Sequence, residues 1–485
     1  MRNLYLILIV FTLFSCKKQQ PNVIFLLTDQ WRASALGYNG DEIVQTPRLD
    51  EFSKSSVNFN NAVSVLPVCT PYRASLMTGR FPTSTGMFIN DLYLPSEELC
   101  IAEIYNDAGY NTAYLGKWHL DGHGRRKNVA SERRQGWTYW KGSECDHQYL
   151  REHYFDNDDA RKKHWKGYST YAIANEAKSY MAKYSQKQNP FFLFVSIGTP
   201  HFPHHTAPKE YMEMYFPEKL KLPPNVPEKQ REKALKELQG YYAHCTATDK
   251  AIGEIIDATK ELKIYDNTII VFTSDHGEMM GAHNFCPYMK HQPYSESANV
   301  PFLISYPNIG DNAGKTANAA ITTPDILPSL LAMCDVDIPS TIEGYDLSEI
   351  ITQPELAPQR AALYMNVSPF GIAFPSDEYR AVRTADYTYV KNHTGALMLF
   401  DNHKDPYQMN NLINNSNYVQ IEEKLDKQLM TELERIGEAD IKPREYYLKK
   451  FGYWGQPQFE KNYHIGNSQN VTTVISPNNT FEIKN

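Results

Sequence analysis

Three short runs of apolar residues limit the folds open to this 485-residue chain more than any other feature. The runs cover residues 23–27, 191–195 and 268–273. A continuous apolar run is typical of a strand that is buried on both faces, as in a parallel sheet. Helical patterns lie between the runs, at residues 101–108, 168–184 and 234–262. This order predicts an α/β fold with a large doubly wound sheet flanked by helices.

Composition excludes several classes of protein. Hydrophobic residues make up 42% of the chain and charged residues 22%, which argues against a disordered chain, a fibrous repeat and a polytopic membrane protein. The net charge is −7, and this mildly acidic balance argues against binding to nucleic acid. Seven cysteines are present without a Cys-x-x-Cys pair, which argues against a zinc ribbon or a thioredoxin-like site.

The pattern changes after about residue 360. Short alternating segments at 379–383, 387–391 and 397–401 predict an antiparallel meander, and a charged helix is expected over about 418–436. The residues after about 440 are polar and weakly patterned. We therefore expect an α/β catalytic domain over residues 22–360. A smaller antiparallel β plus helix subdomain with a polar tail is expected over residues 361–485.

The first residues are typical of a secretory leader. Residues 1–15 carry Arg2, then an apolar run that is too short to span a bilayer. The sequence Leu13-Phe14-Ser15-Cys16 resembles a bacterial lipobox, in which the cysteine is acylated; simple cleavage is the alternative. Residues 16–21 would form a short tether. Acidic residues that mark surface export in similar lipoproteins are missing, so we expect a lipid anchor in the outer membrane, facing the periplasm.

The segment Cys69-Thr70-Pro71-Tyr72-Arg73 is the most specific motif. Pro71 suits the first turn of a helix and Gly79 its end, so Cys69 is expected just ahead of a helix N-terminus, where an anion is favoured. Arg73 would lie in the first turn and could bind oxyanions. The alternative is a buried cysteine in front of an ordinary helix.

Together with other segments, this motif resembles the formylglycine-dependent type I sulfatases of the alkaline phosphatase superfamily, from about residue 21 to residue 411. The matching segments are Asp29-Gln30, Gly116-Lys117-Trp118-His119-Leu120, Thr199-Pro200-His201-Phe202-Pro203, Ser274-Asp275-His276-Gly277, Lys290 and Leu399-Phe400-Asp401. The resemblance implies an alkaline phosphatase-like mixed sheet and a nucleophile made by oxidising Cys69 to formylglycine. A maturation enzyme supplied by the cell would carry out this oxidation.

The resemblance also implies a metal site. Its ligands would be Asp29, Gln30, Cys69, Asp275 and His276. Gln30 stands where aspartate is frequent in the family and His276 where asparagine is frequent, but both can present a neutral lone pair. Two carboxylates and an amide oxygen favour Ca²⁺ over Zn²⁺, although imidazole is less typical of calcium.

Further roles follow from the chemistry of a sulfate ester. Lys117, Lys290 and Arg73 would offset its negative charge. His201 is expected to be the general acid with Lys290 assisting, and His119 the base for the second half of the reaction. For substrate binding we expect His123, Arg125 and His204, with His205, Trp137, Trp140 and the strand at 380–383 as further candidates. Solvated loop positions are the alternative for the histidines and arginines.

The expected function is an exo-acting carbohydrate sulfatase that takes sulfated oligosaccharides. One alternative is a phosphonate or phosphate monoester hydrolase of the same superfamily. Another is a non-catalytic lipoprotein that captures sulfated glycan. No nucleic-acid partner is expected, and contact with a membrane is expected only through the lipid anchor.

Overall fold

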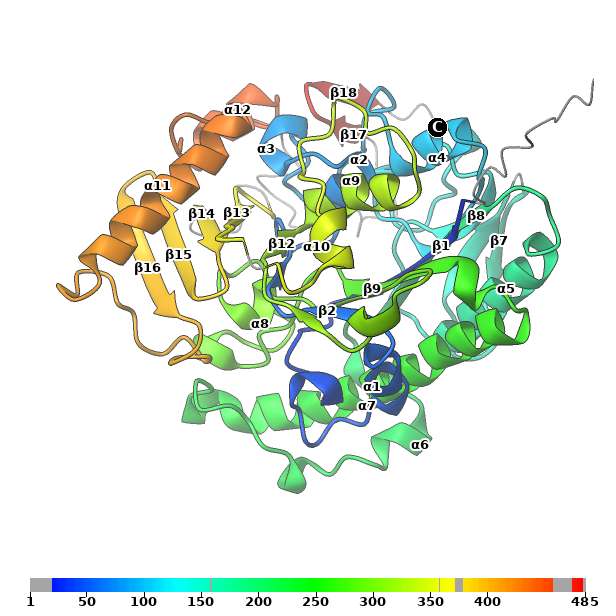
Figure 1. Cartoon of the computed structure of the whole chain (residues 1–485), viewed down its shortest axis with the longest axis horizontal. Coiled ribbons are helices and arrows are strands. Elements are labelled where there is room, and N and C mark those ends of the chain that lie inside the picture. The colour runs from blue at the N-terminus through cyan, green and yellow to red at the C-terminus, as the bar shows by residue number, and fades with distance from the viewer. Residues whose placement is uncertain (1–19, 158, 357, 371–377, 457–472, 483–485) are drawn as a thin grey trace, which may run out of the picture.

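The computed structural model describes residues 20–157, 159–356, 358–370, 378–456 and 473–482 (Figure 1). The predicted leader at residues 1–15 and the first four residues of the predicted tether lie outside the described residues. Gln20 and Pro21, at the end of that tether, contact the body of the protein. The Gln20 side chain donates to the Cys334 carbonyl at 3.1 Å, and the Tyr110 hydroxyl donates to the Pro21 carbonyl at 3.0 Å.

A mixed ten-stranded sheet forms the centre of the described residues. Its strands, in spatial order, are β11 (Thr316–Ala317), β2 (Val57–Phe59), β10 (Phe302–Ser305), β9 (Thr268–Ser274), β1 (Asn22–Asp29), β8 (Phe191–Pro200), β4 (Asn111–Lys117), β5 (Tyr139–Ser143), β6 (His153–Asp156) and β7 (Asp159–His164). The five strands from β9 to β5 run parallel, whereas β10, β6 and β7 pair antiparallel to their neighbours. The three apolar runs form β1, β8 and β9, which confirms the predicted fold class.

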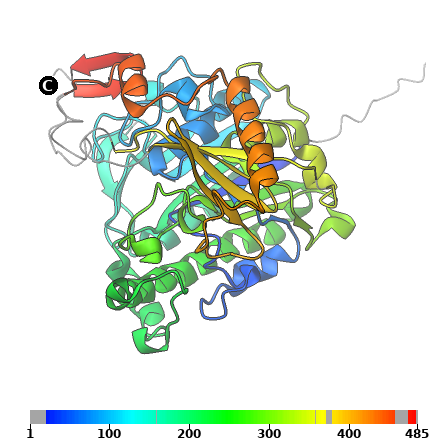
Figure 2. The same ribbon diagram turned by 90° about the vertical axis from the view of Figure 1, so that its left-hand side faces the viewer.

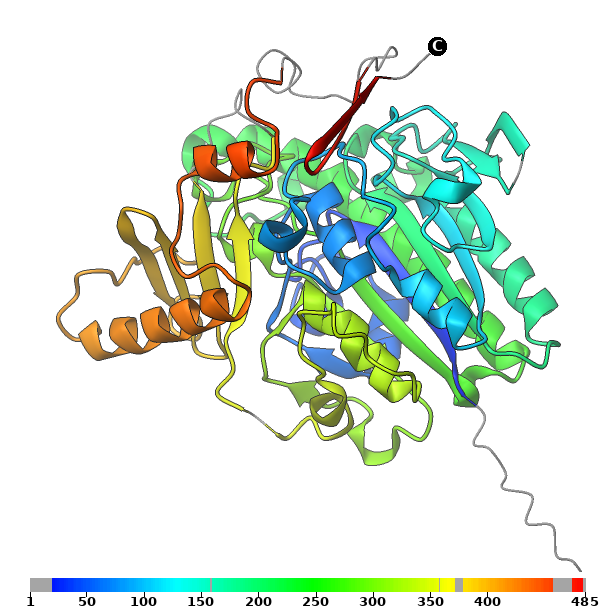
Figure 3. The ribbon, with the colours of Figure 1, turned by 90° about the horizontal axis from the view of Figure 1, so that it is seen from above.

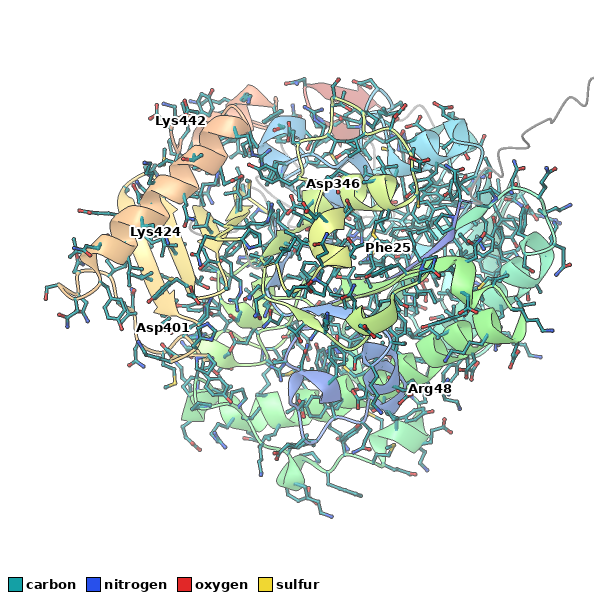
Figure 4. All side chains as sticks on the ribbon, viewed as in Figure 1. Phe25, Arg48, Asp346, Asp401, Lys424 and Lys442 are labelled. Carbon is teal, nitrogen blue, oxygen red and sulfur yellow. The ribbon has the colours of Figure 1, made fainter. Side chains whose placement is uncertain are left out.

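Helices cover both faces of this sheet, because residues of β1 alternate between two cores. Val23, Phe25 and Leu27 belong to one apolar cluster, and Ile24 and Leu26 to the other. Each such buried side chain contributes about 1.5–3 kcal/mol relative to an exposed one. In Figure 1, α7 and α1 lie below the sheet and α2 and α9 above it. Figure 4 places Phe25 near the middle of the molecule and Lys442 at its rim.

The longer helices in the described ranges are α1 (Pro47–Ser53), α2 (Cys69–Thr78), α4 (Ile101–Asp107), α5 (Ser169–Tyr184), α7 (Glu228–Glu261), α9 (Thr323–Met333), α11 (Val419–Arg435) and α12 (Arg444–Lys450). The shorter ones are α3 (Pro82–Thr85), α6 (Lys209–Met212), α8 (Ser295–Ala298) and α10 (Ser348–Thr352). Helix α7 begins six residues before the predicted start, because its first turns carry polar residues without an apolar period. None of the described helices has the length and apolarity that a membrane crossing requires.

The C-terminal part forms a second, four-stranded antiparallel sheet, as predicted. Its strands are β13 (Ala362–Asn366), β14 (Tyr379–Arg383), β15 (Tyr387–Asn392) and β16 (Gly395–Asp401), in that order. One face, with Leu363 and Val382, packs with Leu425 and Leu429 of α11, and Figure 2 shows this helix lying across the sheet. The other face packs against the large α/β body through Val63, Ala298 and Ala320.

Regular structure continues beyond residue 440, where the sequence predicted none. Helix α12 and the hairpin of β17 (Thr473–Ser476) and β18 (Asn479–Glu482) lie there, and Figure 3 shows the hairpin apart from the four-stranded sheet. Aromatic residues hold this region, since the rings of Phe451 and Tyr453 pack edge-on against Phe88. The Ile475 carbonyl accepts a hydrogen bond from the Tyr93 amide at 2.9 Å.

Candidate active site

The residues predicted from the motifs meet at one edge of the large sheet, where its parallel strands end. Asp29 is the last residue of β1 and Lys117 the last of β4, while Asp275 and His201 directly follow β9 and β8. The carboxyl ends of parallel strands lie side by side, and in open α/β sheets ligands bind there. The sequence places these side chains together because each apolar strand ends at a polar residue.

Helix α2 brings Cys69 to the same place. Cys69 is its first residue rather than the residue ahead of it, because Val68 is the extended N-cap; this corrects the prediction by one position. Gly79 ends the helix with a left-handed φ of 68°, as expected. All ten residues of α2 are buried, so the helix is an internal element that holds the cysteine rigidly.

Buried polar groups surround the Cys69 sulfur. His276 Nε2 lies 3.3 Å from it, Lys290 Nζ 3.4 Å and Asp29 Oδ1 3.7 Å. Burial and Asp29 raise the pKa of Cys69, but Lys117, Lys290 and His276 outweigh them and hold the pKa well below its ordinary value. The position therefore favours negative charge.

Two cations bind the two aspartates of this cluster. Lys117 forms an ion pair with Asp29, and Arg73 Nη2 lies 3.0 Å from Asp275 Oδ2. Burial would raise the pKa of Asp29, but Lys117, His201 and Arg73 hold it well below its ordinary value. Burial and the neighbouring Asp29 raise the pKa of Asp275. Arg73 also donates to the Lys117 carbonyl at 2.8 Å and to the hydroxyl of Ser196 at 2.7 Å, so its guanidinium is fixed by the protein itself.

Four side chains could hold a metal ion: ligand atoms of Asp29, Cys69, Asp275 and His276 all lie within 4.8 Å of one another. His276 Nδ1 donates to the Gly277 carbonyl at 2.9 Å, which leaves the Nε2 lone pair facing the cluster. Burial lowers the pKa of His276 and Asp275 raises it, with a net upward shift. The position thus favours a positive charge, which a metal ion bound to Nε2 would supply.

Gln30 supplies a fifth donor to this set. Its amide nitrogen donates to Glu278 Oε2 at 2.5 Å and to the Tyr288 carbonyl at 3.3 Å. These bonds turn the amide oxygen towards the cluster, where it lies 3.5 Å from Lys290 Nζ. The residue has a left-handed φ of 66°, an uncommon backbone conformation for a glutamine. The donor set fits a hard divalent cation.

A cavity of about 180 Å³ opens beside this cluster. Its lining combines cations, imidazoles and aromatic rings. The lining residues are Cys69, Asn90, Lys117, His119, Arg125, His147, His201, Phe202, Tyr288, Met289, Lys290, His291 and Phe370. The predicted nucleophile therefore faces a space large enough for a small organic ligand.

Comparison with known proteins agrees with this geometry. Residues 21–336 match the sulfatase family, and residues 281–435 match the C-terminal part of N-sulphoglucosamine sulphohydrolase. The chain belongs to the sulfatase family. It is 52% identical over 458 residues to an ulvan-active sulfatase of Formosa agariphila, covering 92% of this chain and 89% of that one.

Two further relatives of this sulfatase are similar over most of their length. An endo-4-O-sulfatase of Bacteroides thetaiotaomicron is 30% identical over 482 residues, covering 86% of this chain and 92% of that one. The solved structure of a putative sulfatase from Bacteroides fragilis superposes with a TM-score of 0.79 at 30% identity. It covers 90% of this chain and 99% of that one. The chain is accordingly a sulfuric ester hydrolase.

Of the three residues predicted to bind substrate, the structure places one at the cavity and two outside its lining. Arg125 lines the cavity, whereas His123 and His204 do not. His204 belongs to a short helical turn, His204–Thr206, and its Nδ1 lies 3.0 Å from Glu237 of α7, so its ring points into the body of the protein. His123 contacts the Asp121 carbonyl through Nδ1 at 2.6 Å. These two histidines therefore lie outside the cavity lining, and their contact with substrate stays a prediction.

The additional candidates named for substrate binding also lie elsewhere. Trp137 and Trp140 are buried in the core beneath β4, where both pack against Tyr114. Arg380 is fully buried and pairs with Glu438. His205 is absent from the cavity lining. Proximity in sequence to a site motif did not predict the direction of these side chains.

Sequence analysis missed His147 and Asp91. His147 lines the cavity, and its ring stacks on that of His201 with centroids 4.1 Å apart. Burial and Lys117 lower the pKa of His147 well below its ordinary value. Asp91 contacts both His119 and Arg125. Both missed residues lie in irregular segments with no periodic pattern, so the sequence carried no signal for them.

Proposed function

We propose that this sulfatase removes sulfate from the ends of sulfated oligosaccharides, with formylglycine made from Cys69 as the nucleophile and Ca²⁺ as the metal. The observation that carries the proposal is the position of the Cys69 sulfur, among the cations and metal-ligand atoms and at the wall of a cavity. A nucleophile, an anion-binding set and a leaving-group cavity are what ester hydrolysis requires.

Asp29, Gln30, Asp275, His276 and residue 69 would hold the metal. The donor set supports this assignment, because three oxygen side chains and one imidazole lone pair converge there. When bound, a divalent ion offsets the charge of the sulfate and lowers the pKa of a bound hydroxyl. Three oxygen donors favour Ca²⁺.

The cations of the chain would bind the sulfate and stabilise its developing charge. Of these cations, Lys290 forms no ion pair with a carboxylate of the described residues. Its Nζ lies 3.3–3.5 Å from side-chain atoms of Gln30, Cys69, His201 and His276. Lys117 and Arg73 are held by aspartates and would orient the groups around the sulfate.

Lys290 and His201 together would protonate the leaving oxygen. The Nδ1 atom of His201 lies 2.8 Å from the Phe202 carbonyl and donates to it, which leaves the Nε2 lone pair 3.3 Å from Lys290 Nζ. The pair therefore shares a proton at the cavity wall, and either member can pass it to an alkoxide. This assigns more of the general-acid role to Lys290 than the sequence did.

The size of the cavity supports action at chain ends. At about 180 Å³ it is smaller than the roughly 300–1,000 Å³ of sites that hold drug-sized ligands, so it suits a single sugar ring. Phe202, Tyr288 and Phe370 offer surfaces on which such a ring can stack. A carbohydrate substrate is supported by the name of the Formosa relative, an ulvan-active sulfatase.

The cellular setting is part of the proposal. The lipobox-like leader supports export with a lipid anchor, periplasmic exposure and a supply of pre-cut oligosaccharides. A maturation enzyme of the cell would oxidise Cys69 before export, because the side chain is 1% exposed after folding.

A panel of regiodefined sulfated mono- and disaccharides, with the parent polysaccharides beside them, tests this function. We expect sulfate release from the small sugars, seen by ion chromatography, with little release from polymers. Phosphate and phosphonate monoesters and an aryl sulfate serve as comparison substrates, and Cys69→Ala as the inactive control. Turnover of phosphorus esters or of aryl sulfate alone, with every sugar refused, would contradict the proposal.

A further inference from the structure

Asp91 contacts two residues of the cavity wall at once. Its Oδ1 accepts a hydrogen bond from His119 Nε2 at 2.8 Å and another from Arg125 Nε at 2.8 Å. Its Oδ2 accepts from Arg125 Nη2 at 2.9 Å. Asp91 is itself buried and does not line the cavity, so it acts through its neighbours rather than on a ligand.

This contact fixes which nitrogen of His119 carries hydrogen. Burial raises the pKa of Asp91, but Arg125 and His119 outweigh it and hold the pKa well below its ordinary value. A carboxylate can only accept hydrogen bonds, so His119 Nε2 must be the donor. In the neutral ring, Nδ1 then keeps its lone pair, and this atom is buried with no hydrogen-bond partner among the described residues.

The backbone ties this pair to the nucleophile position. Thr70, which follows Cys69, donates through its hydroxyl to the His119 carbonyl at 2.9 Å and accepts from the Asp91 amide at 3.2 Å. Asp91 and His119 both have a left-handed φ of 62°. Such conformations cost on the order of 1–3 kcal/mol in residues other than glycine and persist where surrounding contacts impose them.

We propose that Asp91 is a positioning residue that holds His119, a residue of the cavity lining, in the tautomer with an unprotonated Nδ1. This inference rests on the proposed function. In the step that His119 serves, the O–H bond of the free hydroxyl at the sulfated residue 69 breaks and an N–H bond forms at Nδ1. The electron pair of that oxygen forms a C=O bond while the C–O bond to sulfate breaks, which releases sulfate. The imidazolium so formed is stabilised by Asp91, and it later releases its proton to water. The same carboxylate orients Arg125 along the cavity wall.

The tautomer itself is the first readout, and it does not depend on turnover. In protein labelled with ¹⁵N-histidine and carrying Cys69→Ser, long-range ¹⁵N–¹H spectra distinguish a protonated ring nitrogen from an unprotonated one. The His119 signal is assigned by its loss in His119→Gln. We expect Nε2 to be protonated and Nδ1 unprotonated, and we expect Asp91→Asn to give a mixture or the reverse. Arg125→Gln should keep the tautomer, because the Asp91–His119 bond remains.

Kinetics on the matured protein give the second readout. We expect Asp91→Asn to lower kcat by about 10²- to 10⁴-fold with KM changed less than about threefold, as for the loss of an orienting carboxylate behind a catalytic histidine. A general loss of folding would instead lower the yield and the melting temperature without changing kcat of the folded fraction. Asp91→Glu, which restores the carboxylate, should recover part of kcat.

The pair His204–Glu237 is the matched control. It has the same imidazole–carboxylate contact and a buried Nε2 without a partner among the described residues, but His204 is outside the cavity lining. Glu237→Gln should alter the His204 signals and leave the His119 tautomer unchanged. A protonated Nδ1 in wild-type His119, an unchanged tautomer in Asp91→Asn, or a kcat within threefold of wild type would each overturn the inference. Failure of wild type to release any sulfate would instead contradict the proposed function.

Discussion

Two regions of this protein bury charges, and they do so in opposite ways. In the C-terminal sheet, Arg380 is fully buried and every nitrogen of its guanidinium has an acceptor, from Glu438, Asn366 and Tyr379. At the cavity, Lys290 faces several groups but no carboxylate, and His119 Nδ1 has no partner among the described residues.

The contrast separates a structural network from a reactive one. Around Arg380 the donors and acceptors satisfy one another, so nothing remains to bind a ligand. Around Cys69 the polar groups converge on the cavity. Some of their hydrogen-bond donors and acceptors have no partner among the described residues. Buried charge alone therefore does not identify the active site, whereas the convergence of buried polar groups on a cavity does.

The largest expected effect is on the nucleophile. Cys69→Ala should lower sulfate release by on the order of 10⁴-fold or more, because no other described group in the cavity offers the same chemistry. Circular dichroism and thermal melting should show a folded protein with a melting temperature within a few degrees of wild type. Retention of activity would contradict the assignment of Cys69.

Removal of the metal should come next. Dialysis against a chelator should lower turnover by on the order of 100-fold or more, since a metal contributes several kcal/mol of charge stabilisation. Readdition of Ca²⁺ should restore it best, measured as the rate of sulfate release against added ion. Asp275→Asn should weaken this rescue. Recovery with Zn²⁺ alone would contradict the choice of calcium.

Breaking the satisfied network should affect stability and leave catalysis intact. Arg380→Met should destabilise the protein by about 3–5 kcal/mol, because Glu438 is left buried without its partner. Denaturant unfolding measures this loss, and kcat of the folded fraction should match wild type. The double variant Arg380→Met/Glu438→Leu should regain most of the stability. A large fall in kcat would erase the distinction between the two regions.

The smallest effect is expected at His123, which was predicted to bind substrate but lies off the cavity. His123→Ala should change kcat/KM by less than about threefold, measured with the best sugar of the panel. Arg125→Ala, at the cavity wall, should change it more. The opposite ranking would mean that His123 contacts the bound sugar.

The sequence predicted the central strands and the residues at their ends for one physical reason. A strand buried on both faces must be apolar throughout, and the first polar residue after it must lie at the edge of the sheet, as Asp29 and Asp275 do. Pro71 and Gly79 likewise predicted the helix that begins at Cys69 and where it ends.

The remainder depends on irregular segments. His204 comes three residues after His201, yet a short helical turn directs it at Glu237 instead of the cavity. Asp91 and His147 reach the site from loops that carry no period. Helix α12 and the final hairpin were missed because their apolar residues are few and contact distant parts of the chain, such as Phe88.

The hydrogen bond between Tyr93 and Ile475 joins two residues that are 382 positions apart in the sequence. Ile475 is buried, and its carbonyl supports the segment that carries Asp91. Closing a loop of this length is a late event in folding, because its entropy must be lost before the contact returns any energy. During folding, the helix that carries Cys69 can form early, but the support of the Asp91 segment must wait until residues 473–476 have docked. A chain that ended before residue 473 would contain every motif residue named above. It would still lack the hydrogen bond from Tyr93 to Ile475 that supports the Asp91 segment.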